Sequence, residues 1–173
     1  MEAFLGAGAG KQLDPELVRE GFAQVDSPGR LERVRSAPTI LLDGAHNPHG
    51  MAATVTALEE EFAFRHLVAV VAVMADKDVS GLLDLMEPVV ARLVVTQNSS
   101  PRSIPADELG ALAVDVFGAD RVSVHPRLSD AIEAAIELAE AGPDDALGGS
   151  GVLVTGSVIT AGEARTLLSG ARS

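Results

Sequence analysis

The chain has 173 residues, 47% of them hydrophobic, and a formal net charge of −12 at pH 7. This length and apolar content are enough for one domain with its own core, and they exclude a disordered chain. The negative charge argues against nucleic acid as a partner, and the absence of cysteine excludes disulfides and thiolate metal sites. No apolar run is long enough to cross a membrane and the first ten residues do not resemble a secretion signal, so the sequence predicts a cytoplasmic protein without membrane contact.

A glycine-rich segment, GAGAGK, lies near the start of the chain and ends at Lys11. It matches a phosphate-binding loop only in part. The first glycine of such a loop would fall at Leu5, and Gln12 stands where the loop requires serine or threonine. We therefore interpret residues 1–12 as a helix end followed by a glycine-rich linker.

A helix is predicted after this linker. Asp14 and Pro15 suit the N-cap and the first position of a helix that we expect to run to about Val25. A turn at 27–29 and a short extended segment at 29–34 follow.

From residue 38 onward, apolar runs of strand length alternate with segments of helical period. The strands are expected at 39–42, 67–73, 92–96, 121–124 and 152–155. The helices are expected at 49–63, 79–90, 105–117, 128–141 and 158–169. This alternation predicts an α/β fold, a three-layer Rossmann-like domain with a mostly parallel sheet of five or six strands.

Residues 39–50, TILLDGAHNPHG, carry the most informative pattern. A buried strand delivers Asp43, His46 and Asn47 to the start of a helix, which is the geometry that holds ligands outside the carboxyl end of a parallel sheet. Two interpretations of Asp43 remain open, a cap for the following turn and a hydrogen-bond acceptor for a ribose. His46 and His49 are three residues apart, but no third ligand follows nearby, so we expect no metal site.

The other strand ends also carry polar residues. Lys77, Arg102 and Arg127 follow the second, third and fourth strands, and Ser157 follows the fifth. Cations gathered on one edge of an acidic chain favour a site for anionic ligands. Backbone N–H groups beside Ser157 can also bind an anion. Because Ser157 is not in a G-x-S-x-G elbow, a serine hydrolase is not indicated.

Six short motifs occur in an order that resembles folylpolyglutamate synthase, an enzyme often bifunctional with dihydrofolate synthase. They are GRLE at 29–32, LDGAHNP at 42–48, ADKD at 75–78, SPR at 100–102, TGS at 155–157 and GEAR at 162–165. The motif at 42–48 is fairly specific to this family, with looser relatives among the Mur ligases. The resemblance implies that residues 27–173 are a Mur-ligase-type C-terminal α/β domain. Residues 1–26 would be the tail of an N-terminal ATPase domain and a linker.

The resemblance also implies a reaction and a set of residues. Such ligases use ATP and Mg²⁺ to join glutamate to dihydropteroate or folate through an acyl phosphate, and their phosphate loop and magnesium ligands lie in the N-terminal ATPase domain, which has no counterpart here. By motif, the ATP contacts would be Arg30 and Asp43, and the catalytic residues His46 and Ser157. Candidate contacts to glutamate or phosphate are Asn47, Asp76, Lys77 and Arg102. The chain alone is expected to be inactive.

Two alternatives stay open. One is a stand-alone, non-catalytic module that binds a nucleotide or an amino acid. The other is the C-terminal domain of a peptidoglycan Mur ligase. The glycine–alanine step at 44–45 and the GRLE motif favour the folate enzyme over the latter.

Overall fold

The computed structural model describes residues 31–62, 64–142 and 149–170. The predicted linker, the helix expected at 14–25 and Arg30 lie outside the described residues.

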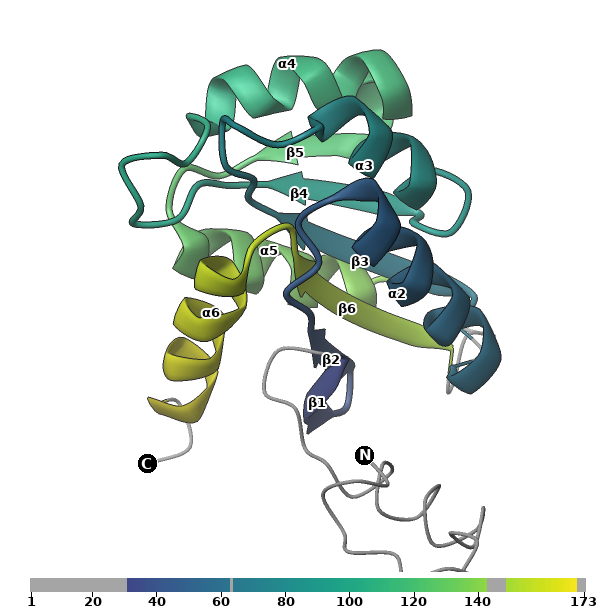
Figure 1. Cartoon of the computed structure of the whole chain (residues 1–173). Helices are drawn as coiled ribbons and strands as arrows, with labels where there is room; N and C mark the ends of the chain where they lie inside the picture. Colours follow the sequence, from purple (N-terminus) through teal and green to yellow (C-terminus); the bar gives the residue numbers. More distant parts are fainter. Residues whose placement is uncertain (1–30, 63, 143–148, 171–173) are drawn as a thin grey trace, which may run out of the picture.

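A six-stranded sheet forms the centre of the described domain (Figure 1). Its strands lie side by side in the order β1-β2-β6-β3-β4-β5. Strand β1 is antiparallel to β2, and the other neighbouring pairs are parallel. The strand bounds are β1 (Glu32–Ser36), β2 (Thr39–Leu42), β3 (His66–Val71), β4 (Arg92–Val95), β5 (Val122–Val124) and β6 (Ser150–Thr155).

Helices cover both faces of this sheet. They are α2 (Pro48–Glu61), α3 (Val79–Met86), α4 (Ala106–Phe117), α5 (Leu128–Glu140) and α6 (Val158–Gly170), with a short 3₁₀ turn η2 (Ala119–Arg121). One apolar cluster joins α2, α3 and α4 to the first face, and a second joins α5 and α6 to the other. The prediction of a three-layer, mostly parallel α/β domain is therefore confirmed.

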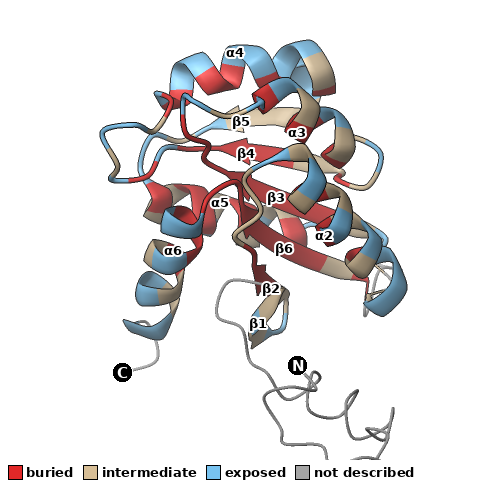
Figure 2. Ribbon diagram, viewed as in Figure 1, coloured by how far each residue is buried: buried red, intermediate tan, exposed pale blue. Residues whose placement is uncertain are grey.

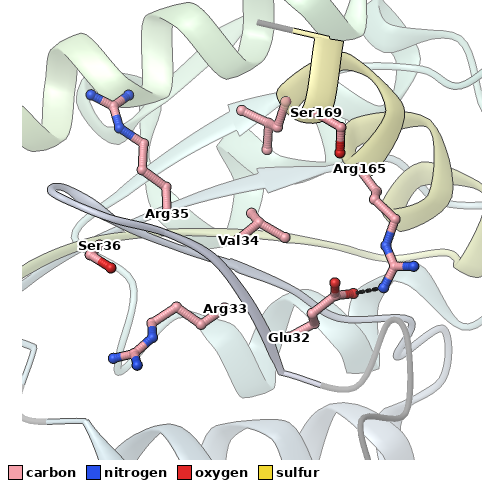
Figure 3. A pocket seen from close by; sticks show the side chains of 8 residues that line it. Glu32, Arg33, Val34, Arg35, Ser36, Arg165 and Ser169 are labelled. Carbon is pink, nitrogen blue, oxygen red and sulfur yellow. Dashed lines mark hydrogen bonds and ion pairs between the residues drawn. The ribbon is translucent and has the colours of Figure 1, made fainter. Parts of the chain in front are cut away.

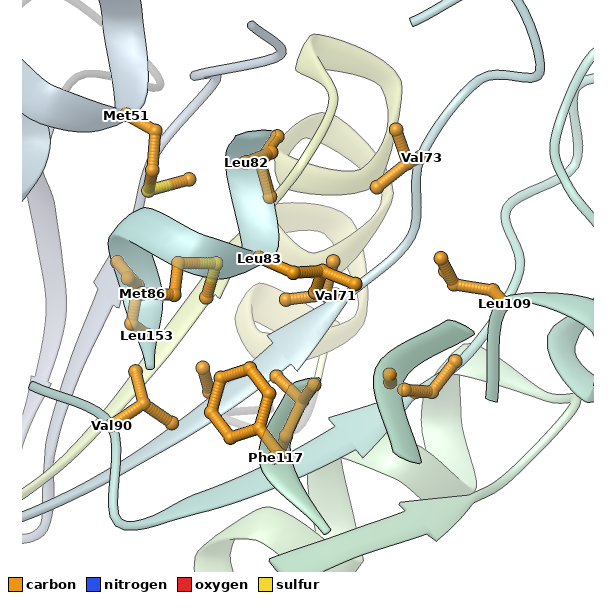
Figure 4. Packing of buried hydrophobic residues seen from close by; sticks show 14 of the residues in the cluster. Met51, Val71, Val73, Leu82, Leu83, Met86, Val90, Leu109, Phe117 and Leu153 are labelled. Atoms are coloured by element: carbon orange, nitrogen blue, oxygen red, sulfur yellow. The ribbon is translucent and has the colours of Figure 1, made fainter. Parts of the chain in front are cut away.

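The four inner strands, β2, β6, β3 and β4, are buried on both faces, the edge strands β1 and β5 are only partly buried, and each helix exposes its outer side (Figure 2). This explains why the four inner strands are nearly continuous apolar runs instead of alternating patterns. On the first face, Met51, Leu83, Met86 and Phe117 pack against the sheet (Figure 4). Aliphatic and methionine side chains thus supply most of a core that contains few aromatic residues.

Most predicted bounds agree with the structure to within two residues, and two segments differ by more. The extended segment expected at 29–34 is strand β1 at Glu32–Ser36 and pairs with β2, across a register shift between Arg33 and Arg35. Helix α3 ends at Met86 instead of residue 90. Pro88 lacks the backbone N–H that would continue the helical hydrogen bonds, so the regular helix stops ahead of it, although Glu87 itself keeps helical geometry.

Arg121 closes the C-terminal end of α3. Its guanidinium donates to the carbonyl oxygens of Glu87, Val90 and Ala91, pairs with the Glu87 carboxylate, and lies 4.9 Å from the centre of the Phe117 ring. One planar cation thus satisfies three carbonyl oxygens, that of the C-cap residue Glu87 and two in the segment between α3 and β4.

Replacing Arg121 with lysine is expected to lower the free energy of unfolding by about 1–2 kcal/mol, because one ammonium group cannot reach all of these acceptors. Urea denaturation measures the difference. The matched control is Arg127→Lys, since Arg127 is largely exposed and pairs only with Asp130 on its own helix turn. The control should change stability by less than about 0.5 kcal/mol. Equal effects of the two substitutions would contradict this account.

Candidate functional site

The carboxyl ends of the parallel strands define one edge of the sheet, and most of the predicted site residues follow them. Since β6 lies between β2 and β3, the loop after β6 is central. Gly156 N donates to Ala45 O at 3.1 Å, which joins the loops after β6 and β2. Ala75 N donates to Arg102 O at 2.9 Å, which joins the loops after β3 and β4. The four loops form one continuous edge.

Asp43 is buried at the end of β2, with 4% of its surface exposed. Its Oδ1 accepts hydrogen bonds from Ala45 N and the Thr54 hydroxyl, both at 2.9 Å, and its Oδ2 accepts one from Leu31 N at 3.1 Å. The carboxylate therefore ties the segment before β1, its own turn and helix α2 together. Both oxygens take part in the fold, which supports the turn-capping interpretation; contact with ATP stays a prediction.

His46 and Asn47 lie in the loop between β2 and α2. The His46 ring is half-buried and its Nδ1 is 3.0 Å from Gly44 O. Because a carbonyl can only accept, Nδ1 carries the proton, and the tautomer with this contact has its lone pair on Nε2. The side chain of Asn47 accepts from Gly50 N at 2.8 Å and is the N-cap of α2, with Pro48 following. Asn47 thus has a structural role in addition to its predicted ligand contact.

Ser157 directly precedes helix α6 and is almost fully buried. Its Oγ accepts from Ile159 N at 3.1 Å, as an N-cap does. Gly156, just before it, has φ of 98°, and an added Cβ would lie 2.6 Å from Ala72 O. No hydrogen bond joins Ser157 to His46 within the described residues, so the structure shows no nucleophile–base pair here.

The loops after β3 and β4 meet through an ion pair. Arg102 donates to Asp76 at 2.7 Å, and the Lys77 ammonium lies 3.4 Å from the same carboxylate. The hydrogen bond from Arg102 is the largest cause that holds the pKa of Asp76 below its ordinary value. The three residues predicted to contact glutamate or phosphate, Asp76, Lys77 and Arg102, therefore lie on the same edge. Asp76 already pairs with both Lys77 and Arg102.

Three polar residues of this edge were missed as candidates from the sequence. Asn98 and Thr160 are buried and bonded to each other at 3.0 Å, and Glu163 binds Ser99. The sequence could have indicated Thr160, because it is a polar residue at a buried position in the apolar stripe of α6. In addition, the hydroxyl of Thr155 is fully buried without a hydrogen-bond partner among the described residues.

A separate surface hollow of about 420 Å³ lies between β1 and α6 (Figure 3). Val34 and Leu168 are part of its wall. Arg165 pairs with Glu32, and Arg35 lies 3.6 Å from Glu140. Three arginines, Arg33, Arg35 and Arg165, line the hollow, and two of them face carboxylates, as both cations of the carboxyl edge also do.

The described residues contain neither a cluster of metal ligands nor a membrane-spanning helix. No group of three or more His, Asp or Glu side chains that could hold a metal ion occurs among the described residues. None of the described helices is long and apolar enough to cross a membrane.

The family model for "Mur ligase, glutamate ligase domain" matches residues 29–158. The chain belongs to this family. It is 53% identical over 173 residues to the dihydrofolate synthase/folylpolyglutamate synthase of Mycobacterium tuberculosis, covering 96% of this chain and 36% of that protein. The similarity to folylpolyglutamate synthases predicted from the motifs is therefore confirmed.

Solved structures agree. The folylpolyglutamate synthase of Mycobacterium tuberculosis complexed with ADP and AMPPCP superposes with a TM-score of 0.84 at 51% identity, over 96% of this chain and 37% of that one. Escherichia coli FolC in complex with DHPP and ADP gives 0.75 at 26% identity, over 95% of this chain and 36% of the other. The chain thus spans little more than a third of the length of these relatives.

Proposed function

We propose that this chain is the C-terminal domain of an ATP-dependent ligase that adds glutamate to dihydropteroate or folate through an acyl phosphate. The observation that carries the proposal is 53% identity to a dihydrofolate synthase/folylpolyglutamate synthase across almost the whole chain. Residues 27–173 would form this domain, and residues 1–26 the tail of an ATPase domain and a linker. A cytoplasmic location stays a prediction from the sequence.

The donors of the carboxyl edge suit a phosphate-bearing ligand. Lys77 and Arg102 supply positive charge, and the N-termini of α2 and α6 supply backbone N–H groups. ATP would contact Asp43 and Arg30 as the resemblance implies, although Arg30 lies outside the described residues. Mg²⁺ would neutralise phosphate charge when bound. Since the described residues offer no cluster of metal ligands, we assign it no residue in this chain.

The tautomer of His46 that the contact with Gly44 O fixes offers a proton acceptor at Nε2. With Nδ1 bound to Gly44 O, Nε2 can accept a proton from the ammonium group of glutamate, which must be neutral before it attacks an acyl phosphate. Ser157, with Asn47 on the neighbouring loop, would orient the carboxylates of the amino acid. The attack forms the amide bond and expels phosphate, and this edge would keep the amine and acyl groups aligned while water is excluded.

A chimera tests the proposal. This chain replaces the matching segment of the Mycobacterium tuberculosis relative, and glutamate-dependent ADP release is measured with folate present. We expect activity in the chimera and none in the isolated chain. His46→Ala in the chimera should lower kcat by about 100-fold, as loss of a general base does. A folded chimera that binds nucleotide but never releases ADP would contradict the proposal.

Calorimetry with the isolated chain distinguishes the stand-alone binding module. A sensor that works alone would bind ATP or glutamate tightly, whereas one wall of a larger site should bind them weakly or not at all. A UDP-linked peptidoglycan precursor accepted by the chimera in place of folate would favour the Mur-ligase alternative.

A further inference from the structure

Helix α6 is bonded to three other parts of the sheet edge by side chains on its first two turns. The hydroxyl of Thr160 donates to Ala72 O at 3.3 Å and accepts from Asn98 Nδ2 at 3.0 Å. Arg165 pairs with Glu32 of β1. Glu163, which lies between Thr160 and Arg165 in the helix, accepts hydrogen bonds from Ser99 in the loop after β4. The N-terminus of α6 is thereby held in register with its neighbours.

Glu163 makes a charge-assisted contact with Ser99. Its Oε1 accepts from Ser99 N at 3.1 Å and from the Ser99 hydroxyl, and Oε2 lies 3.4 Å from Ser99 N. Hydrogen bonds to an ionised acceptor are roughly twice as strong as neutral ones. Glu163 is therefore the strongest attachment of an otherwise exposed loop residue to the helix.

The same loop carries Arg102 three residues later. Ser100 N donates to Asn98 Oδ1 at 3.0 Å, and Arg102 N donates to the hydroxyl of Ser100 at 3.2 Å. Ser99 lies inside the first of these two hydrogen-bonded turns, so we expect a displacement at Ser99 to move the backbone that leads to Arg102, whose carbonyl is also held by Ala75 N. Arg102 in turn donates to Asp76 across the gap between two strand ends.

We infer that Glu163 is a positioning residue of the carboxyl edge, which acts through Ser99 to hold Arg102 against Asp76. It touches neither of these two residues in the structure. The role in ligand binding rests on the proposed function, but the mechanical coupling does not. Glu163 belongs to the GEAR motif. The coupling gives this glutamate a structural role, which is to fix the position of Arg102 in the loop after β4.

The pKa of Asp76 measures the position of Arg102. The charged groups placed against Asp76 in the structure are Arg102 and Lys77, and the bond from Arg102 is the largest cause of its lowered pKa. If Arg102 moves away, the pKa of Asp76 must rise. Removing the negative charge of Glu163 has the opposite direct electrostatic effect, a slight lowering, so the two explanations differ in sign.

The experiment is a carbon-13 NMR titration of Asp76 in the isolated chain, without nucleotide. The Arg102→Gln variant removes the cation and so gives the largest rise in the pKa of Asp76. In Glu163→Ala we expect this pKa to rise by at least about half as much. Glu163→Gln should restore the wild-type pKa, because its amide oxygen can still accept both bonds from Ser99. Ser99→Ala should act in the same direction as Glu163→Ala and less strongly.

Circular dichroism and thermal melting establish that each variant is folded. An unchanged or lowered pKa of Asp76 in Glu163→Ala would overturn the inference, as would a rise that Glu163→Gln reproduces in full. If Glu163→Ala failed to fold, the Ser99→Ala result would decide in the same way. Because no nucleotide or substrate is present, failure here is distinct from an inactive chimera.

Discussion

The Gly156→Ala variant is expected to lose about 3–5 kcal/mol of unfolding free energy. Two causes add. The backbone at Gly156 has φ of 98°, which an L-residue with a side chain rarely adopts. The added Cβ would also lie 2.6 Å from Ala72 O, a backbone atom that cannot rotate away. The domain must therefore move β6 away from the end of β3.

Gly162 offers a matched control in the following helix. A Cβ at Gly162 meets nothing within 4 Å, and the residue lies in α6. Alanine there should stabilise the domain by about 0.5–1 kcal/mol, since it lowers the entropy of the unfolded chain and favours helix. Urea denaturation of both variants gives the comparison. If Gly156→Ala were as stable as the wild type, the close approach of the two loops would be wrong.

Asp43→Ala should also lower the unfolding free energy by about 3–5 kcal/mol. The substitution leaves the N–H groups of Leu31 and Ala45 and the hydroxyl of Thr54 without their shared acceptor. Unpaired buried donors cost about 1–3 kcal/mol each, and the lower end applies here because Leu31 and Ala45 are partly buried and the Thr54 hydroxyl keeps Gly50 O as an acceptor at 3.1 Å. The segment before β1 and helix α2 should loosen together, because one carboxylate holds both.

Two milder variants separate these bonds. Thr54→Val removes one donor and should cost about 1–2 kcal/mol. Asp43→Asn keeps the shape of the side chain but puts an amide NH₂ beside at least one donor. Its loss of unfolding free energy should therefore fall between those of Thr54→Val and Asp43→Ala. Chemical denaturation gives the order of stability, and amide exchange at Leu31 and Ala45 gives the location. A stable Asp43→Ala variant with unchanged exchange at both amides would contradict the structural role.

This result affects how mutants of the proposed ligase should be interpreted. Loss of activity in Asp43→Ala would reflect a loosened edge as well as any lost contact with ATP. His46 and Lys77 are better probes of ligand binding, because each is partly exposed and makes few contacts with the rest of the domain. The experiments on Asp43 therefore belong with stability, and those on His46 with catalysis.

Much of the fold followed from local patterns. The alternation of apolar runs with helical periods predicted every parallel strand and every described helix, because burial on two faces and burial on one face leave different periodicities. Asp78 and Ser157 precede helices and cap them, as short polar side chains do. The polar residues after each strand predicted the edge that carries the candidate site.

The order of the strands could not be read from those patterns. Periodicity shows that a strand is buried but not which strand lies beside it, since that depends on contacts between distant segments. Only the structure placed β6 between β2 and β3, which puts Ser157 near the loop of His46. It also paired β1 antiparallel to β2, which the short extended segment at 29–34 left undetermined.

The two interpretations of Asp43 show the same division. The sequence determined that a carboxylate would stand at the end of a buried strand, at the edge where ligands bind. Whether that carboxylate would be available or already engaged depended on Leu31 and Thr54, which are 12 and 11 residues away. Tertiary packing brought their donors to it, because a buried carboxylate is stable only when its oxygens accept hydrogen bonds. The sequence thus determined which groups reach the edge, and the tertiary structure decided how they are paired.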